Sequence, residues 1–475
     1  MTPATPGMAE DPAALLPEAL LIAGAVVTLL VGMFSARTRQ YRALAVALAA
    51  TLASLVLGVV DAGGHRTIYD GSYAIDVATT ATRIIVAAAT AITLLLARAR
   101  VAHTPRETEF YVLVLLASTG TVVLAGATDL LLLAVGYLLA SIPLYALVGW
   151  SRDAANAEAT LKTYLMGALM SIAMLTGIAV LTGIAGGSTS YANLTSGLAH
   201  APRAAFAFGL VAVLAGLLFK AGAVPAHFWV PDAVSGASTP AAAFASTVPK
   251  IGALVGAYRL MVALPAHTLN WQLLIAVLAA ASMTLGNLAA YRQDDPKRLL
   301  AYSTISQVGY LLMAVAVAGH TSHAASALLL YLGAYAAANL GAFAVLAALP
   351  DRHRLADWRG TGRAHPMLIT VLGVCLLALV GIPPTAVFLG KLTVFTATWD
   401  AGLGWLVVIA ALNTVASLYY YLRWLAPAVL APASPAASTA QRLPAAVAYL
   451  CGIGTFAAGI AAVALYNTAP TVLTR

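Results

Sequence analysis

Long apolar runs separated by short polar segments make up most of the 475-residue chain. A helix needs about 20 apolar residues to cross a bilayer, and many of the runs reach that length. The runs are continuous rather than alternating, which excludes a membrane β-barrel. We therefore predict an all-α polytopic membrane protein with about 14 transmembrane helices. The predicted spans lie near residues 14–34, 42–60, 75–97, 110–126, 130–149, 160–184, 204–221, 240–262, 271–291, 299–318, 324–348, 366–397, 403–424 and 443–466.

The composition agrees with this class and gives no sign of a second domain. Hydrophobic residues make up 61% of the chain and charged residues 9%, whereas about 25% of the residues of a soluble domain are charged. We predict a single transmembrane domain over residues 1–475. The twelfth predicted span is too long for one crossing, and the motif GIPP at 381–384 interrupts it, because a proline removes a backbone donor and clashes with the preceding turn.

The arginines and lysines of the predicted loops are distributed unevenly. If the loop after the first span is cytoplasmic, the inside loops hold fifteen of them and the outside segments three. This bias follows the positive-inside rule and predicts a cell-membrane protein with both termini on the outer side. It also explains the net charge of +8 without nucleic acid. The inside set is Arg37, Arg39, Arg42, Arg98, Arg100, Arg106, Arg152, Arg292, Lys297, Arg298, Arg352, Arg354, Arg359, Arg363 and Arg442; the outside set is Arg66, Arg203 and Arg475.

Three of the five lysines fall within predicted spans: Lys220, Lys250 and Lys391. A lysine at the centre of a transmembrane helix costs about 2.5–3.5 kcal/mol. One interpretation is that these side chains reach the membrane surface, as long cationic side chains near helix ends do. The other is a proton relay, because a buried amine is neutralised more easily than an exposed one and can load and release a proton. Prolines near Lys220 and Lys391 favour broken helices, whose free backbone groups can hold water.

Five motifs occur in order along the chain. They are AALLPEALLIAGA at 13–25, LLFKAGAVPAHFWVPDAVSGASTP at 217–240, VPKIGAL at 248–254, KRLLAYSTISQVGYLL at 297–312 and GIPPTAVFLGK at 381–391. Together they resemble the subunit N family of bacterial respiratory complex I, the proton-translocating NADH:quinone oxidoreductase. More broadly, they are similar to the antiporter-like subunits shared with Mrp cation/proton antiporters. The resemblance covers nearly the whole chain.

This resemblance implies a fold and a set of site residues. The family has two inverted five-helix repeats, here about 110–262 and 271–424, and the seventh and twelfth spans are broken. Its proton-relay residues match Lys220, Lys250, Lys391 and His227. The family carries no cofactor in this subunit. NADH, FMN, iron–sulfur clusters and quinone are expected on partner subunits, and other membrane subunits of complex I are the expected partners in the bilayer.

Two positions depart from the family pattern. The glutamate that pairs with the lysine of the seventh span is replaced by Leu138, and Asp129 and Glu158, at the ends of spans five and six, are the possible substitutes. A histidine that is frequent in the tenth span is replaced by Gln307, which can hold water but does not carry a proton. These changes keep two alternatives open: a structural complex I subunit with an impaired channel, and an Mrp-like antiporter or another transporter.

Three further features have simpler interpretations. Arg83, about two turns into the third span, is expected to extend to the lipid headgroups or to a neighbouring subunit. Cys375 and Cys451 are expected to be small core residues, since two scattered cysteines cannot hold an iron–sulfur cluster or a structural zinc. His320 and His323 form an exposed loop pair, which we expect to be unliganded. The first residues lack a basic stretch, so no cleavable signal peptide is expected.

Overall fold

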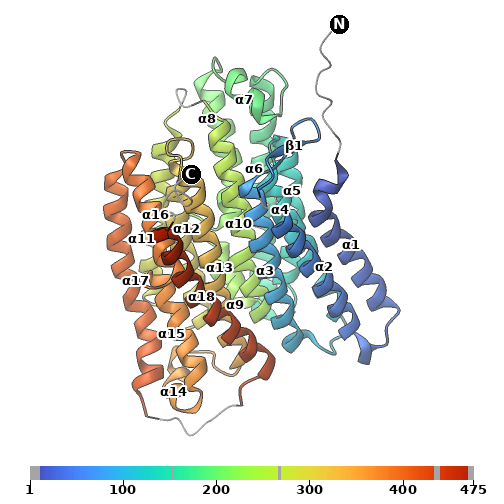
Figure 1. Cartoon of the computed structure of the whole chain (residues 1–475), viewed down its shortest axis with the longest axis vertical. Coiled ribbons are helices and arrows are strands. Elements are labelled where there is room, and N and C mark those ends of the chain that lie inside the picture. Colours follow the sequence, from blue (N-terminus) through green and yellow to red (C-terminus); the bar gives the residue numbers. More distant parts are fainter. Residues whose placement is uncertain (1–10, 62, 152, 266–268, 433–438, 469–475) are drawn as a thin grey trace.

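The computed structural model describes residues 11–61, 63–151, 153–265, 269–432 and 439–468, which form a bundle of long helices (Figure 1). A two-stranded hairpin is the only sheet in this described part of the chain. The helices are α1 (Leu16–Met33), α2 (Tyr41–Val60), α3 (Val77–Val101), α4 (Glu107–Gly126), α5 (Leu130–Val148), α6 (Ala154–Ile184), α7 (Tyr191–Gly197), α8 (Arg203–Ala221), α9 (Trp229–Gly236), α10 (Thr239–Ala263), α11 (Trp271–Ala290), α12 (Pro296–Ala316), α13 (Ala324–Ala348), α14 (Thr361–Ala364), α15 (Pro366–Val380), α16 (Ala386–Asp400), α17 (Gly404–Leu430) and α18 (Arg442–Thr468); the strands are β1 (Arg66–Ile68) and β2 (Tyr73–Ile75).

Twelve stretches of helix in the described residues are long and apolar enough to cross a membrane. The helix α10 is not among them, although it is 25 residues long and nearly all of its side chains are buried. It contains two charged residues, Lys250 and Arg259, and three small polar ones; such a helix is tolerated where protein rather than lipid surrounds it. The prediction of a helical membrane protein is confirmed, and the count of fourteen spans and the inverted repeats stay predictions.

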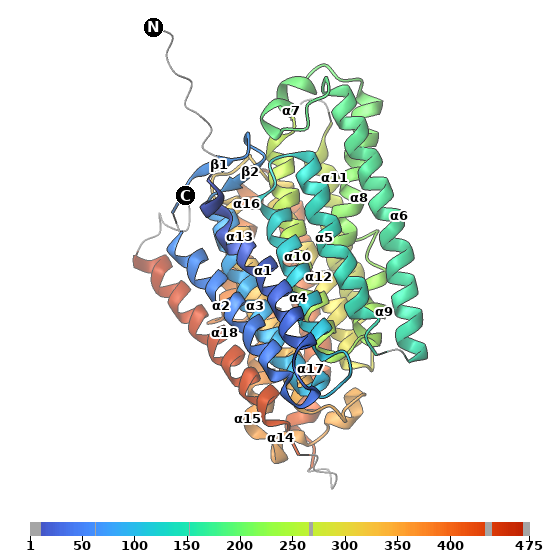
Figure 2. The same ribbon diagram turned by 90° about the vertical axis from the view of Figure 1, so that its right-hand side faces the viewer.

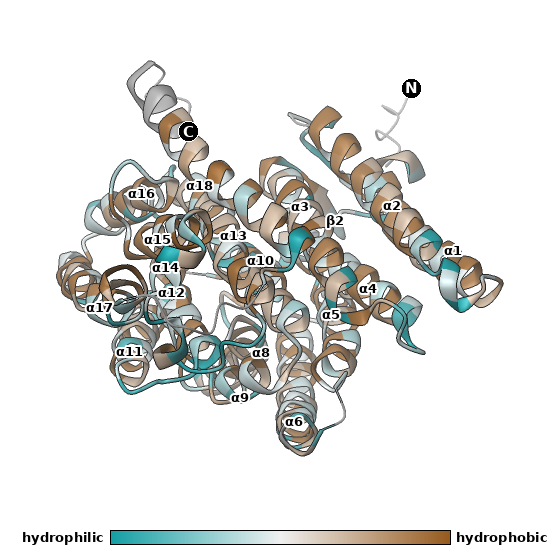
Figure 3. Cartoon of the chain, turned by 90° about the horizontal axis from the view of Figure 1, so that it is seen from below, coloured by the Kyte–Doolittle hydropathy of each residue, from teal (hydrophilic) through white to brown (hydrophobic). Residues whose placement is uncertain are grey.

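Apolar side chains cover the outside of the bundle. Seen along the helices, most of the ribbon is brown or white, and teal gathers in the connecting segments (Figure 3). The helix α6 lies at one edge, packed on α8 (Figure 2), and only 28% of the residues in its most apolar stretch are buried. By contrast, 94% of the corresponding stretch of α12 is buried. The polar positions of α10 and α12 therefore belong to the interior.

Two helices are interrupted inside the bundle, and the backbone at both breaks has the same features. The helix α8 ends at Gly222 (φ +78°) and α15 ends at Gly381 (φ +92°), both left-handed conformations that favour glycine. A short non-helical segment with a cis X–Pro bond follows each glycine, at Pro225 and Pro384. The chain then resumes as α9 and α16. The predicted break at GIPP is thus present, and a second one lies in the KAGAVP stretch.

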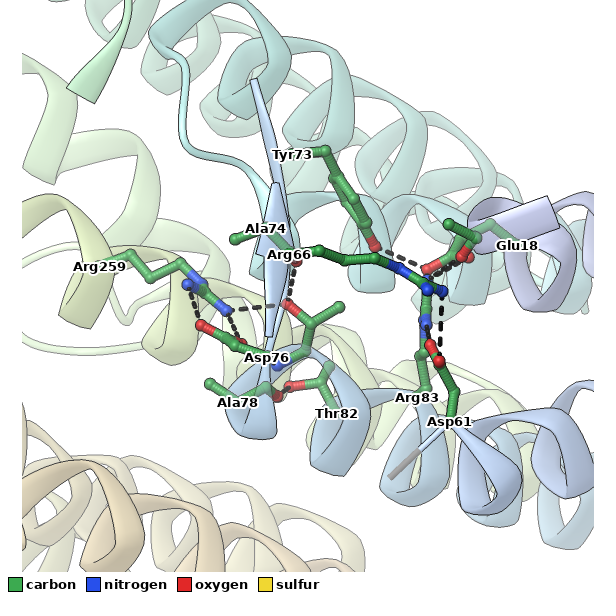
Figure 4. A network of polar contacts seen from close by, with 12 residues as sticks. Glu18, Asp61, Arg66, Tyr73, Ala74, Asp76, Ala78, Thr82, Arg83 and Arg259 are labelled. Carbon is green, nitrogen blue, oxygen red and sulfur yellow. Dashed lines mark hydrogen bonds and ion pairs between the residues drawn. The ribbon is translucent and has the colours of Figure 1, made fainter. Parts of the chain in front are cut away.

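A buried ion cluster attaches the first three helices to one another (Figure 4). Arg83 of α3 is 1% exposed; its Nε donates to Glu18 at 2.8 Å and its Nη1 to Asp61 at 3.0 Å. The hydroxyl of Tyr73 donates to the same Glu18 carboxylate at 2.6 Å. The expectation that Arg83 extends to the lipid headgroups is wrong, because carboxylates from α1 and from the end of α2 meet it inside the protein.

The C-terminal part of α10 is bound to α3 in a similar way. Arg259 donates to Asp76, the N-cap of α3, with Nη1···Oδ2 at 2.8 Å, and to the hydroxyl of Thr79 at 2.8 Å (Figure 4). Burial by itself would raise the pKa of Asp76, but the hydrogen bonds and charge of Arg259 outweigh it, and the net result is a lowered pKa. The carboxylate is therefore ionised at neutral pH.

Candidate functional site

The three lysines singled out by the sequence all lie inside the bundle. The exposed fraction is 2% for Lys220, 0% for Lys250 and 3% for Lys391. None of the three side chains reaches the protein surface, so the surface-reaching interpretation does not describe this structure. No carboxylate of the described residues forms a salt bridge with any of them.

Lys220 stands in the last turn of α8 and faces α5. Its Nζ donates to the hydroxyl of Ser141 and lies 4.9 Å from the centroid of the Tyr137 ring. Ser141 in turn donates to the carbonyl of Tyr137 at 2.6 Å, which leaves the lone pairs of its oxygen for the lysine. Ser141 therefore holds the ammonium group, one helical turn from Leu138 in α5.

Lys250 follows Pro249 in the middle of α10. The Nζ atom has no hydrogen-bond partner among the described residues, and it lies 4.9 Å from the centroid of the Trp229 ring. Trp229 is fixed by its own indole N–H, which donates to the carbonyl of Phe219 at 2.8 Å. The amine also lies beside the first break, because a Cβ atom added to Gly222 would be 3.6 Å from Nζ. A buried amine in this position satisfies its donors only with water or a transient partner.

Lys391 lies in the first half of α16 and reaches back across the second break. Its Nζ donates to the carbonyls of Val380 at 2.8 Å and Leu379 at 3.2 Å, and it lies 4.1 Å from the centroid of the Tyr310 ring. These carbonyls belong to the last turn of α15, where the helix dipole is negative. The helix break therefore provides a cation site that contains no carboxylate.

The structure brings Gln307 to the same carbonyl. Its Nε2 donates to Leu379 at 2.9 Å, and its Oε1 accepts from the hydroxyl of Tyr331 at 2.6 Å. Gln307, Tyr331 and Lys391 thus form one buried polar cluster. Sequence reasoning named Gln307 but missed Tyr331, whose only signal is a tyrosine deep within a predicted span.

Buried polar side chains lie between Lys250 and this cluster. Asn339 donates to the hydroxyls of Ser246 at 3.1 Å and Thr247 at 2.8 Å. Tyr335 donates to the Ser246 carbonyl at 2.7 Å and lies 3.1 Å from the Thr304 hydroxyl. Ser246 precedes Lys250 by one helical turn, and Thr304 precedes Gln307 by about one. Sequence reasoning missed all five; a lone asparagine in a predicted span was the available signal.

The other predicted residues occupy different places. His227 lies half-buried in the first break, with Nδ1 3.3 Å from the Pro225 carbonyl. Asp129 caps α5 and accepts from the backbone N–H of Leu131 at 2.7 Å. Glu158 is exposed and pairs with Lys162 at 2.7 Å. No contact in the described part of the chain links these three residues with the buried lysines.

A polar cavity of about 680 Å³ lies where α9, α10 and α12 meet, with Ser235–Pro240 and Lys297 among its lining residues. The Lys297 amine donates to the carbonyls of Ser235 at 2.6 Å and Ala237 at 2.9 Å. This end of the bundle contains α14 and the arginine-rich loops, and we call it the arginine-rich end. The cavity is lined by Thr239 and Pro240 at the N-terminus of α10, about three helical turns from Lys250.

A metal site has no support in the described residues. They contain no group of three or more His, Cys, Asp or Glu side chains that could hold an ion. His320 contacts the carbonyl of Ala318 at 3.1 Å, and His323 lies 3.5 Å from Asp400. Cys375 and Cys451 are buried, as core residues are.

Comparisons with known proteins agree on a family. The family model described as NADH:quinone oxidoreductase/Mrp antiporter, TM, matches residues 127–417. The chain is 51% identical over 456 residues to NADH-quinone oxidoreductase subunit N 1 of Streptomyces griseus, covering 94% of this chain and 96% of the relative. It is 49% identical over 461 residues to subunit N of Mycobacterium sp. (strain JLS), covering 96% and 98%.

Solved structures share the fold. A chain of respiratory complex I from Thermus thermophilus with bound aureothin is 32% identical with a TM-score of 0.81, and the match covers 95% of this chain and 98% of that one. A chain of the Mrp complex from Dietzia sp. is 20% identical with a TM-score of 0.84, covering 97% and 98%; that likeness shows the fold alone. The chain therefore belongs to the subunit N family of the NADH:quinone oxidoreductase/Mrp antiporter membrane subunits.

Proposed function

We propose that the chain is a proton-translocating, non-redox membrane subunit of an NADH:quinone oxidoreductase. The observation that carries the proposal is that three buried lysine amines lie at or beside helix breaks and that buried polar side chains connect the surroundings of Lys250 with those of Lys391. Three amines without a carboxylate partner inside a membrane bundle are costly, and such residues characteristically mark ion pathways. The relatives are named as subunits of the same oxidoreductase.

The proposed steps use only this chain's residues for proton transfer. A shift of charge in a neighbouring subunit changes the proton affinities of Lys250 and Lys220. A proton then passes between Lys250 and Lys391 through the polar groups around Ser246 and Asn339. The Leu379 and Val380 carbonyls hold the ammonium form of Lys391 until the proton leaves. His227 stays a predicted relay residue, and Asp129 and Glu158 stay possible auxiliary groups; none of the three contacts the lysines.

The surroundings of this subunit belong to the same proposal. Electron transfer with NADH, FMN, iron–sulfur clusters and quinone takes place on partner subunits, and other membrane subunits lie beside this chain. The protein resides in the cell membrane with both termini on the outer side, and it is organised as two inverted repeats over about 110–262 and 271–424. The arginine-rich end then faces the cytoplasm.

The test is the number of protons translocated per electron pair by the assembled complex in vesicles. Lys250→Met and Lys391→Met should each lower this ratio while NADH oxidation with an artificial acceptor continues. Lys162→Met is the matched control, because Lys162 is half exposed and pairs with the surface residue Asp232 at 3.1 Å. An unchanged ratio in both variants would refute the relay.

One observation favours a second function, that of a structural subunit with an impaired channel. Lys220 bonds to the Ser141 hydroxyl, where the family pattern has a carboxylate from position 138. A serine neither balances the charge of the lysine nor takes up its proton at neutral pH. The same assay separates the two functions, because a structural subunit tolerates all three lysine replacements with full pumping. An Mrp-like antiporter would instead exchange cations for protons when reconstituted alone.

A further inference from the structure

A second set of buried polar side chains lies on α11, α12 and α17, apart from the groups that link Lys250 with Lys391. It comprises Asn287, Ser303, Asn413, Tyr420 and Tyr421, and all five are at most 9% exposed. Asn287 Nδ2 lies 3.0 Å from Asn413 Oδ1, and the Tyr420 hydroxyl donates to Asn287 Oδ1 at 3.1 Å. The Tyr421 hydroxyl bonds to Ser303, and the two tyrosine rings lie 4.3 Å apart. We call these five residues the polar column.

At the end away from the arginine-rich loops, two series of contacts connect the polar column with Lys391. Thr414 follows Asn413 in α17, and its hydroxyl lies 3.1 Å from that of Tyr310, the ring that Lys391 contacts. On α12, Ser303 precedes Gln307 by one helical turn. Gln307 donates to the Leu379 carbonyl, which also accepts from the Lys391 amine.

The lower end of the column lies at the arginine-rich end of the bundle. The rings of Tyr420 and Tyr291 are 6.1 Å apart. Arg423 donates to the carbonyl of Tyr291 and forms an ion pair with Asp294. The Asp294 side chain is 73% exposed and that of Arg423 31%. The column therefore extends from solvent-exposed charges to the immediate surroundings of Lys391.

On the opposite side of Lys391 the buried positions of α16 are mainly apolar. Between Lys391 and the outer end of α16 the buried positions are Val394, Ala397 and Thr398. The Thr398 hydroxyl donates to the Val394 carbonyl of its own helix at 2.8 Å. Ala397 packs with Val317 and Ala324 in a separate hydrophobic cluster.

We infer that the polar column is the route by which Lys391 exchanges protons with the arginine-rich face, an inference that rests on the proposed function. Polar groups between transmembrane helices also serve packing alone. Helix packing alone does not explain why these polar groups form a continuous series from the surface to a single amine. It also does not explain why the buried positions on the other side of that amine are mainly apolar. Hydroxyl groups accept one proton while donating another, and amides hold water in place. On this inference the column is the uptake side of Lys391, and the polar groups around Ser246 and Asn339 connect Lys391 with Lys250.

The test compares four variants of the assembled complex by protons translocated per electron pair. Ser303→Ala with Tyr421→Phe removes two hydroxyls and little volume. Lys391→Met removes the amine, and a triple variant combines both changes. The control is Thr398→Val, which removes a buried hydroxyl from the apolar side without changing its shape. Complex content on native gels and NADH oxidation with an artificial acceptor separate assembly from pumping, and Tyr421→Phe alone serves if the double variant assembles poorly.

We expect the hydroxyl variant to lower the proton ratio to the value of Lys391→Met. The triple variant should be no lower, because both changes interrupt the same route, and Thr398→Val should pump fully. A hydroxyl variant that pumps fully while Lys391→Met does not would overturn the inference and leave the proposed function standing. The same conclusion would follow if the triple variant translocated fewer protons per electron pair than Lys391→Met, or if Thr398→Val lowered this ratio. Full pumping by Lys391→Met would refute both the inference about the polar column and the proposed relay role of Lys391.

Discussion

Replacing Lys250 by methionine separates a functional amine from a structural one. The methionine keeps an unbranched, flexible side chain of similar reach, so the surroundings of Trp229 stay filled. The change removes an amine that is fully buried and has no hydrogen-bond partner among the described residues. If the amine serves proton transfer and nothing else, the variant folds at least as well as the parent chain.

The magnitude follows from the contacts. Removing a lysine from the centre of a transmembrane helix recovers about 2.5–3.5 kcal/mol. The contact with the Trp229 ring at 4.9 Å is worth up to about 2 kcal/mol when desolvated. The net effect is a gain of about 1 kcal/mol. For Lys391→Met the balance reverses: two charged hydrogen bonds to carbonyls, at about 1.5–3 kcal/mol each, and the contact with Tyr310 are lost, giving a net loss of roughly 2–5 kcal/mol.

The assay is thermal unfolding of the full-length chain in detergent, followed by tryptophan fluorescence. The expected order of midpoints places Lys250→Met at or above the parent chain and Lys391→Met below it, although both variants lower proton pumping in the assembled complex. A fall of several kcal/mol for Lys250→Met would mean that the amine has a stabilising partner inside the folded protein. That result would refute the reasoning that assigns Lys250 to transport.

Three further outcomes follow from the contacts at the helix ends. Glu18→Gln leaves Arg83 buried with a weakened partner; the cost should approach the 3–5 kcal/mol of a broken buried ion pair, and an unchanged unfolding midpoint would contradict it. Asp76→Asn should destabilise the chain by about 1.5–3 kcal/mol at pH 7 through its bonds with Arg259. Because the folded-state pKa of this carboxyl is lowered, its contribution is complete above the unfolded-state pKa and is lost as pH falls through the folded-state value, so the midpoints of variant and parent should converge in acid; a constant difference would argue against the ion pair. Gly381→Ala forces a side chain into a left-handed conformation at φ +92°, at roughly 1–2 kcal/mol, and equal midpoints would show that the break relaxes.

The helices could be predicted well from the sequence because a helix that crosses lipid needs a continuous run of about 20 apolar residues. Continuous apolar runs placed one span at 271–291, and the helix observed is Trp271–Ala290. The motif GIPP placed a break between α15 and α16 for a local reason, since a proline cannot continue the hydrogen bonds of a helix. The depth of Lys250 followed from its distance to both ends of α10. These features depend on neighbours along the chain.

The contacts that the sequence did not reveal join residues far apart along the chain. Arg83 meets Glu18, which is 65 positions away, and Lys220 meets Ser141, which is 79 positions away. A serine or a tyrosine in an apolar span carries no mark of its partner, since either residue also occurs in ordinary helix packing. Arg83 was therefore expected at the membrane surface, and Ser141 was not expected to hold a lysine.

The three lysine sites share a feature that bears on how a proton could move. Each amine lies 4–5 Å from the centroid of an aromatic ring: Tyr137 for Lys220, Trp229 for Lys250 and Tyr310 for Lys391. A ring face attracts an ammonium ion by about 0.5–2 kcal/mol, whereas truncating one partner of a buried ion pair costs about 3–5 kcal/mol. A carboxylate would therefore hold the charged form more firmly than a ring does.

Rings, hydroxyls and carbonyl dipoles stabilise the ammonium form without fixing it. The charged and neutral forms of such an amine differ by less than they would beside a carboxylate, so a charge arriving in a neighbouring subunit can decide between them. A charge 10 Å away contributes about 1.7 kcal/mol at an effective dielectric constant near 20. That energy is comparable with a ring contact and smaller than the cost of breaking a buried ion pair. On this argument the replacement of the family's glutamate by Leu138 makes Lys220 easier to switch from a distance, and Leu138→Glu should make its proton harder to release.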